Sequence, residues 1–213
     1  MIPVKPQPEP DIFDRLVRIP GNRFLKSLSD SKPANRQWES HDYWKHIRFP
    51  LYNAYGRICA YSAHWIPCGS SVPNVDHYIP KSVKPEIAYE WSNYRLAGAL
   101  VNALKGNWQD VLDPFTIEID WFFLGFPSLL LHPNPELLPP IQQQIWNTIN
   151  RLRLNDNQTF VEERGAWLEP YCQGKEDFSV LKKNAPFIAY ELERQNLVES
   201  IKTIMVYRQE EQD

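Results

Sequence analysis

VDHYIP, residues 75 to 80, places an aspartate and a histidine side by side at what the sequence predicts to be the end of a buried strand. Pro80 follows, and because proline fixes φ near −65° we expect it to stiffen the next turn. An Asp-His pair alone is weak evidence, since such residues often only satisfy each other's hydrogen bonds. Residues further along the chain must decide whether Asp76 and His77 join two strands or carry chemistry.

Three polar residues follow the pair at defined spacing. Asn93 in EWSNYRLA comes sixteen residues after His77, Asn102 comes nine residues later, and Lys105 three further on. AGALVNALKG, residues 97–106, is predicted to be helical. Helical spacing puts leucines on one side, facing the core, and a polar stripe on the other, facing the strand end or solvent. The leucines are Leu96, Leu100 and Leu104, and the stripe is Arg95, Gly98, Asn102 and Lys105.

Gly98 lies in this predicted stripe. Glycine inside a helix costs about 0.5–1 kcal/mol relative to alanine, so we expect it where a backbone or ligand approaches closely.

The combined spacing resembles that of HNH endonucleases of the ββα-metal type. In that family an Asp-His pair ends one strand, an Asn lies on the next strand, and an Asn or His lies on the following helix. The match covers roughly residues 55–110 and is more specific than any single element. VDHYIPKS, YEWSNYRLA and DVLDPF are also similar to bacterial HNH proteins of uncharacterised or phage-defence type.

The resemblance implies a metal-dependent endonuclease that hydrolyses DNA phosphodiester bonds and leaves 5′-phosphate and 3′-hydroxyl ends. It also leads us to expect the effector of a bacterial defence system. Two alternatives stay open: a non-catalytic nucleic-acid-binding subunit of an ATPase-containing complex, and an RNA nuclease that cleaves tRNA.

The residue types suit this chemistry. Histidine, with an ordinary pKa near 6.5, is a suitable base at neutral pH, so we assign this role to His77. Asp76 and Asn102 offer hard oxygen ligands for Mg²⁺ or Mn²⁺, which keep water in their remaining positions. Asn93 is expected to brace the loop that holds His77 by bonding its backbone. The candidate contacts to nucleic acid are Lys81, Arg95 and Lys105, the last as a point charge near a phosphate.

No structural zinc is expected. Many HNH proteins carry two Cys-x-x-Cys pairs around the site, but the equivalent positions here hold one thiol, Cys59, beside Ser62, Gly98 and Val101. A site made of Cys59, His64 and Cys68 lacks a fourth ligand, so buried thiols and a surface histidine are favoured. Aromatic packing by Tyr55, Tyr61, Trp65 and Trp91 is expected instead. His41, His46 and His132 have no partners at motif spacing, and Asn107 and Asp110 are expected to cap the helix in preference to contacting a metal-bound water.

Composition bounds the class of protein. The chain has 213 residues, of which 43% are hydrophobic and 13% aromatic, which excludes a disordered chain. Its three cysteines give no disulfide framework and favour a reducing compartment. The start lacks the pattern of a signal peptide, and no apolar run reaches the roughly 18 residues that span a bilayer. We therefore predict a cytoplasmic protein without membrane association.

The net charge of −3 is unevenly distributed. Residues 1–107 carry fourteen Lys and Arg against nine Asp and Glu, whereas residues 108–213 carry nine against seventeen. A stand-alone nucleic-acid binder usually has a larger basic excess, because phosphate neutralisation supplies most non-specific affinity. We therefore predict a small local basic patch or a regulatory protein partner, such as an ATPase.

The expected organisation is an α+β protein with a ββα-metal core. Residues 1–50 form an N-terminal arm and a packing helix, residues 51–112 the core, and residues 113–213 a mostly helical region packed on it. Strand or hairpin pattern is predicted at 113–124 and a helix near 139–152. In the first region, one face carries four basic residues: Arg15, Arg18, Arg23 and Lys26. We favour a face exposed to solvent over a face that contacts phosphate.

Overall fold

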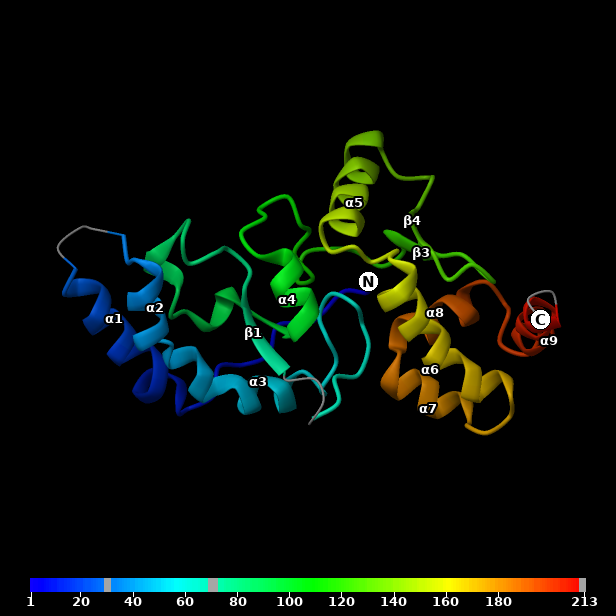
Figure 1. Cartoon of the computed structure of the whole chain (residues 1–213), viewed down its shortest axis with the longest axis horizontal. Coiled ribbons are helices and arrows are strands. Elements are labelled where there is room, and N and C mark those ends of the chain that lie inside the picture. The colour runs from blue at the N-terminus through cyan, green and yellow to red at the C-terminus, as the bar shows by residue number, and fades with distance from the viewer. Residues whose placement is uncertain (29–31, 69–72, 211–213) are drawn as a thin grey trace. The chain divides into compact units, whose positions relative to one another are not determined.

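The structure is a computed structural model that describes residues 1–28, 32–68 and 73–210. It contains both helices and strands, which confirms the α+β class (Figure 1). The chain divides into two compact units. The first, which we call the motif unit, comprises Lys5–Ala60 and Ile66–Gln109; the second, the C-terminal unit, comprises Met1–Val4, Tyr61–Trp65 and Asp110–Asp213.

The motif unit places a set of short helices before two strands and a helix. A π-helical turn, η1 (Asp14–Arg18), continues into α1 (Ile19–Lys26). The helices α2 (Asn35–Ser40) and α3 (Arg48–Ala54) are separated by the 3₁₀ helix η2 (Tyr43–Ile47). The strand β1 (Pro73–His77) comes next, then the 3₁₀ turns η3 (Pro85–Ile87) and η4 (Trp91–Asn93), the strand β2 (Tyr94–Gly98) and the helix α4 (Ala99–Lys105).

β1 and β2 form an antiparallel pair that sets the position of the motif residues. Asp76 lies opposite Arg95, and His77 lies opposite Tyr94. α4 follows β2 without a loop and packs against both strands. Pro80 begins the turn after β1, where its carbonyl accepts hydrogen bonds from Val83 and Lys84.

The predicted helix starts too early. Residues up to Gly98 pair with β1, so the strand replaces the helical conformation that their spacing favoured, and α4 begins at Ala99. The buried side of α4 carries Val101 and Lys105, while Leu100 is 47% exposed, so the predicted leucine face is wrong. A Cβ added at Gly98 would meet no atom of the described residues within 4 Å, so a close approach of another backbone segment there is wrong, while the alternative of a bound ligand stays a prediction.

The N-terminal region belongs to the motif unit from Lys5 onward, whereas Met1–Val4 belong to the C-terminal unit. Phe13 is fully buried, with its ring 5.7 Å from that of Trp91 and 5.8 Å from that of Tyr94. Gly21 lies against the ring of Tyr89, where a Cβ would come within 2.1 Å of a ring carbon, so only glycine fits. Arg18 forms ion pairs, which occupy its guanidinium, with Glu9, Asp14 and Glu90.

The C-terminal unit pairs two short strands and otherwise consists of helices. β3 (Phe122–Leu124) and β4 (Leu131–Pro133) are antiparallel, so only the last three residues of the predicted strand segment form a strand. The predicted helix at 139–152 is confirmed as α5 (Pro139–Arg151), with Ile145, Ile149 and Leu152 buried. The remaining elements are η5 (Asn157–Val161), α6 (Glu162–Cys172), α7 (Phe178–Asn184), α8 (Pro186–Arg194) and α9 (Ile201–Glu210).

His64 is a buried group of the C-terminal unit. It is 2% exposed, against the prediction of a surface histidine, and its Nδ1 lies 3.3 Å from Glu163 Oε2. Burial, opposed by Glu163 and assisted by Arg164 and the amino group of Met1, lowers the pKa of His64. The imidazole is therefore neutral at neutral pH.

The predictions for the cysteines were partly right, because Cys59 is buried but Cys68 is exposed. Within the described ranges, no helix is both long and apolar enough to cross a membrane.

Candidate active site

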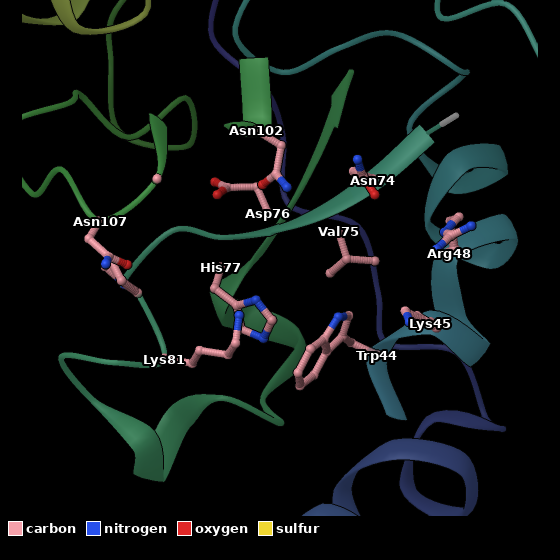
Figure 2. Close-up of a pocket in the computed structure, with 12 residues that line it drawn as sticks. Trp44, Lys45, Arg48, Asn74, Val75, Asp76, His77, Lys81, Asn102 and Asn107 are labelled. Atoms are coloured by element: carbon pink, nitrogen blue, oxygen red, sulfur yellow. The ribbon is translucent and has the colours of Figure 1, made fainter. Parts of the chain in front are cut away.

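A pocket of about 230 Å³ lies at the end of β1, within the motif unit. Asp76, His77 and Asn102, three of the predicted site residues, line it together (Figure 2). Asp76 and His77 come from the last two positions of β1, and Asn102 comes from the middle of α4. Residues that are far apart in the sequence therefore converge because β1, β2 and α4 pack on one another.

Asp76 is held by an internal cation. Its side chain is 4% exposed, and Lys105 Nζ lies 3.0 Å from its Oδ1. Lys105 is fully buried and also donates to the carbonyl oxygens of His77, at 2.9 Å, and Tyr78, at 3.0 Å. These three acceptors use all three N–H donors of the ammonium group. Lys105 is thus a structural tie between α4 and the end of β1, and the predicted contact with a phosphate is not available to it.

Three contacts orient His77. Its Nε2 lies 2.9 Å from the carbonyl oxygen of Ala88, which also accepts from the hydroxyl of Tyr94 at 2.8 Å. The ring meets Trp44 and Tyr94 edge-on, with centroids 4.7 Å and 5.2 Å away. Because a carbonyl oxygen can only accept, Nε2 carries the proton of the neutral ring and Nδ1 keeps its lone pair. This tautomer leaves Nδ1 able to accept a proton.

The surroundings of His77 favour its neutral form. Burial first, and then the positive charges of Lys81 and Lys105, lower its pKa to about 3, although the bond to Ala88 opposes the shift. A general base must be unprotonated before it acts, and His77 meets that condition at neutral pH. A pKa near 3 also makes the ring a weaker proton acceptor than the ordinary histidine we expected. An anionic phosphate bound in the pocket would raise that pKa, because an opposite charge nearby favours imidazolium.

The brace predicted for Asn93 is present. Its Oδ1 accepts from the amide of Ile79 at 2.8 Å, and its Nδ2 donates to the carbonyls of Ile79, at 3.0 Å, and Ile87, at 3.3 Å. Its own backbone carbonyl accepts from the amide of Tyr78 at 2.9 Å. The buried side-chain amide of Asn93 therefore ties the segment after His77 to the segment that carries Ala88. It thereby fixes the backbone next to His77 and the carbonyl that Nε2 contacts. Asn93 lies at the end of η4, directly before the strand on which it was expected.

Asp76 and Asn102 suit a hard divalent cation. Both supply oxygen atoms to one pocket, and Mg²⁺ or Mn²⁺ needs few protein ligands because it retains water and accepts phosphate oxygens. The ammonium of Lys105 beside Oδ1 weakens the attraction of Asp76 for a cation. Across the described residues, no group of three His, Cys, Asp or Glu side chains could hold a metal ion. Asp76 and Asn102 therefore fit an open site in which water completes the coordination of the cation.

Lys81 and Arg95, the other two residues predicted to contact nucleic acid, differ in their positions. Lys81 lines the pocket, and its Nζ lies 5.1 Å from the centre of the Trp44 ring. Arg95 is 4% exposed and donates to the carbonyls of Ser92 and Tyr94. Arg95 is part of β2, and its guanidinium bonds the backbone. The contact with nucleic acid that was predicted for Arg95 is therefore not available to it.

Several lining residues were missed by sequence reasoning. Trp44 and Lys45 come from η2, Arg48 from the first turn of α3 and Asn74 from β1. The sequence offered one signal for this wall, the basic excess of the first half of the chain, and that excess did not distinguish Lys45 and Arg48 from the other basic residues. Asn107 also lines the pocket, and its Oδ1 accepts a hydrogen bond from Ser82 Oγ at 3.0 Å. The helix α4 ends at Gly106, which has a φ of 46°, so the predicted cap at Asn107 is wrong.

Comparison of the chain with protein-family models and with curated proteins gives no match. The geometry of the pocket and the spacing of its residues are therefore the basis for assigning a function.

Proposed function

We propose that the protein is a metal-dependent HNH-type endonuclease that hydrolyses phosphodiester bonds of DNA in the pocket at the end of β1. The observation that carries this proposal is the convergence of the carboxylate of Asp76, the amide of Asn102 and a neutral imidazole with a free Nδ1. The order β1, β2, α4 agrees with that of a ββα-metal core, and it supports the resemblance seen in the sequence.

His77 would act as the general base. Its Nδ1 would take the proton from the attacking water as the bond from water oxygen to phosphorus forms and the bond from phosphorus to the 3′-oxygen breaks. The departing 3′-oxygen would take a proton from solvent. Ala88 would hold the ring in place through Nε2, and Asn93 would hold the backbone on both sides of it. Lys81, which lines the pocket with its Nζ beside the Trp44 ring, would balance negative charge on the bound phosphate.

A divalent cation bound by Asp76 and Asn102 would stabilise the negative charge that develops on the phosphate and on the departing 3′-oxygen. Lys105 would keep the Asp76 carboxylate facing the pocket whether or not the cation is bound. A role as a defence effector, a regulatory ATPase partner and a cytoplasmic location stay predictions from the resemblance, charge and composition.

The test is nicking of supercoiled plasmid by the purified chain in Mg²⁺ or Mn²⁺. We expect nicked product that EDTA prevents, and no product from His77→Ala. Circular dichroism and thermal unfolding must show that the variant keeps its fold. His46, which is exposed, supplies the matched control: His46→Ala should nick like the wild type. If wild type and His77→Ala give equal product at every metal concentration, the catalytic assignment is wrong. Cleavage of tRNA without cleavage of duplex DNA would instead favour the RNA nuclease.

A further inference from the structure

The pocket has a second polar wall that the proposed chemistry does not use. Figure 2 shows Lys81 and Asn107 to one side of His77, and Arg48 and Asn74 to the other. All four line the same pocket. The chemistry proposed above uses only the side with Asp76, Asn102 and Lys81.

On this second wall, Arg48 is a cation whose guanidinium N–H groups have no acceptor among the described residues. Among the residues that the structure describes, it forms no ion pair, and its Nε is buried without a hydrogen-bond partner. A buried donor left unbonded costs about 1–3 kcal/mol, so such donors in native proteins usually have an acceptor. A group bound in the pocket can supply that acceptor, and a guanidinium suits phosphate oxygens because it offers several donors in one plane.

Asn74 supplies a second donor beside this cation. Its side-chain amide is half-buried on β1, two residues before Asp76, and makes no hydrogen bond within the described part of the chain. Lys45, also on this wall, is already paired with Asp42. Arg48 and Asn74 are thus the groups on this wall with donor capacity left for a ligand.

We infer that Arg48 and Asn74 form a second phosphate subsite, which binds the phosphate next to the one attacked at His77. This inference rests on the proposed function for the identity of the attacked phosphate. It adds that the substrate is a nucleic-acid strand with at least two consecutive phosphates, because a small monomeric phosphodiester would leave Arg48 and Asn74 without a bound phosphate.

The inference is tested by binding, which does not require cleavage. Fluorescence anisotropy measures the affinity of the whole chain for a labelled DNA oligonucleotide in EDTA at several salt concentrations. Loss of one phosphate contact should reduce the salt slope by about one. We expect Arg48→Gln to weaken binding about tenfold with that reduced slope. Arg48→Lys, which keeps the charge but loses the planar donors, should keep the slope and weaken binding less.

The matched control is Arg36→Gln, which removes the same charge from an exposed position on α2 of the same unit and should bind like the wild type. Equal affinity of Arg48→Gln, Arg36→Gln and wild type would overturn the subsite, as would equal losses in both variants. Wild-type chain that binds DNA and shows the Arg48 effect, but never nicks plasmid, would keep the subsite and reject the nuclease. An Arg48 effect on RNA alone would keep the subsite and change the substrate.

Discussion

Replacing Lys105 with methionine tests the link between the fold and the site most directly. Methionine keeps the length and apolar stem of the side chain but removes the ammonium, which bonds Asp76 and two backbone carbonyls. Breaking a buried ion pair by removing one partner typically costs about 3–5 kcal/mol, because the remaining charge is left buried and unpaired. The two carbonyls lose acceptor bonds worth about 1 kcal/mol each, although these terms do not simply add.

We therefore expect Lys105→Met to lower the free energy of unfolding of the motif unit by about 3–5 kcal/mol. That is a large part of the roughly 5–15 kcal/mol that stabilises a typical domain. The assay is urea unfolding followed by tryptophan fluorescence and far-ultraviolet circular dichroism, with separate transitions fitted where the two probes differ.

A double variant separates charge burial from lost packing. Asp76→Asn removes the carboxylate with which Lys105 pairs, so Lys105→Met with Asp76→Asn should be more stable than the sum of the single losses predicts. Lys26→Met is the matched control, because Lys26 is exposed on α1 and its replacement should change stability by no more than about 0.5 kcal/mol. A loss below about 1 kcal/mol for Lys105→Met, with an unchanged dependence on urea, would refute the assignment of Lys105 as a buried tie.

Three further outcomes follow from the site and its surroundings. Asn93→Ala should lower kcat for nicking more than it raises KM, and should lower stability by about 1–3 kcal/mol, because Ile79 loses two buried backbone bonds. Asn102→Ala should raise the Mn²⁺ concentration for half-maximal nicking about tenfold or more, with the fold unchanged. The pKa values of His64 and His77 lie below that of an unfolded histidine, so the unfolded chain binds more protons below about pH 6.5. The contribution of these two histidines to stability should therefore be constant above that pH and fall as the pH decreases from 6.5 to 5, by about 1.4 kcal/mol per pH unit for each histidine that stays neutral.

Exposed residues of the same type provide the controls. Asn53→Ala, on the outside of α3, should leave nicking and stability unchanged. His46→Gln should keep the full pH dependence of stability, whereas His64→Gln should reduce its slope. An unchanged Mn²⁺ requirement in Asn102→Ala would contradict its role as a ligand. Equal free energies of unfolding at pH 7 and pH 5 would contradict the neutral burial of the two histidines.

The sequence predicted those features that depend on neighbours along the chain. The strand that ends at His77 and the brace from Asn93 follow from apolar pattern and from the habit of asparagine side chains to bond backbone groups. The start of α4 was predicted wrongly because residues 94–98 have helical spacing, and pairing with a distant strand overrides such local preference. A local sequence pattern cannot show whether a segment will pair with a strand that is distant in the sequence.

Burial of charge also escaped prediction. Lys105, three residues after Asn102, was expected outside, as most lysines are. The carboxylate of Asp76 and the carbonyls of His77 and Tyr78 make its burial stable. Arg95 is hidden for a related reason, since its strand lies against β1. The pocket wall of Trp44 and Arg48 could not be inferred, because nothing in the spacing connects residues 44–48 with residues 74–77.

The division of the chain limits how the protein can be shortened. The backbone passes between the units after Val4, Ala60, Trp65 and Gln109, so neither unit is a continuous stretch of sequence. A fragment that stops at residue 109 would retain every lining residue of the pocket but would leave two short segments without their partners. Val4 would lose its bond to Pro114, and Trp65 would lose its bond to Asn184. Transplanting the motif unit alone into another protein would therefore require closing one gap in the backbone, between Ala60 and Ile66, and gene fusions should preserve the chain whole.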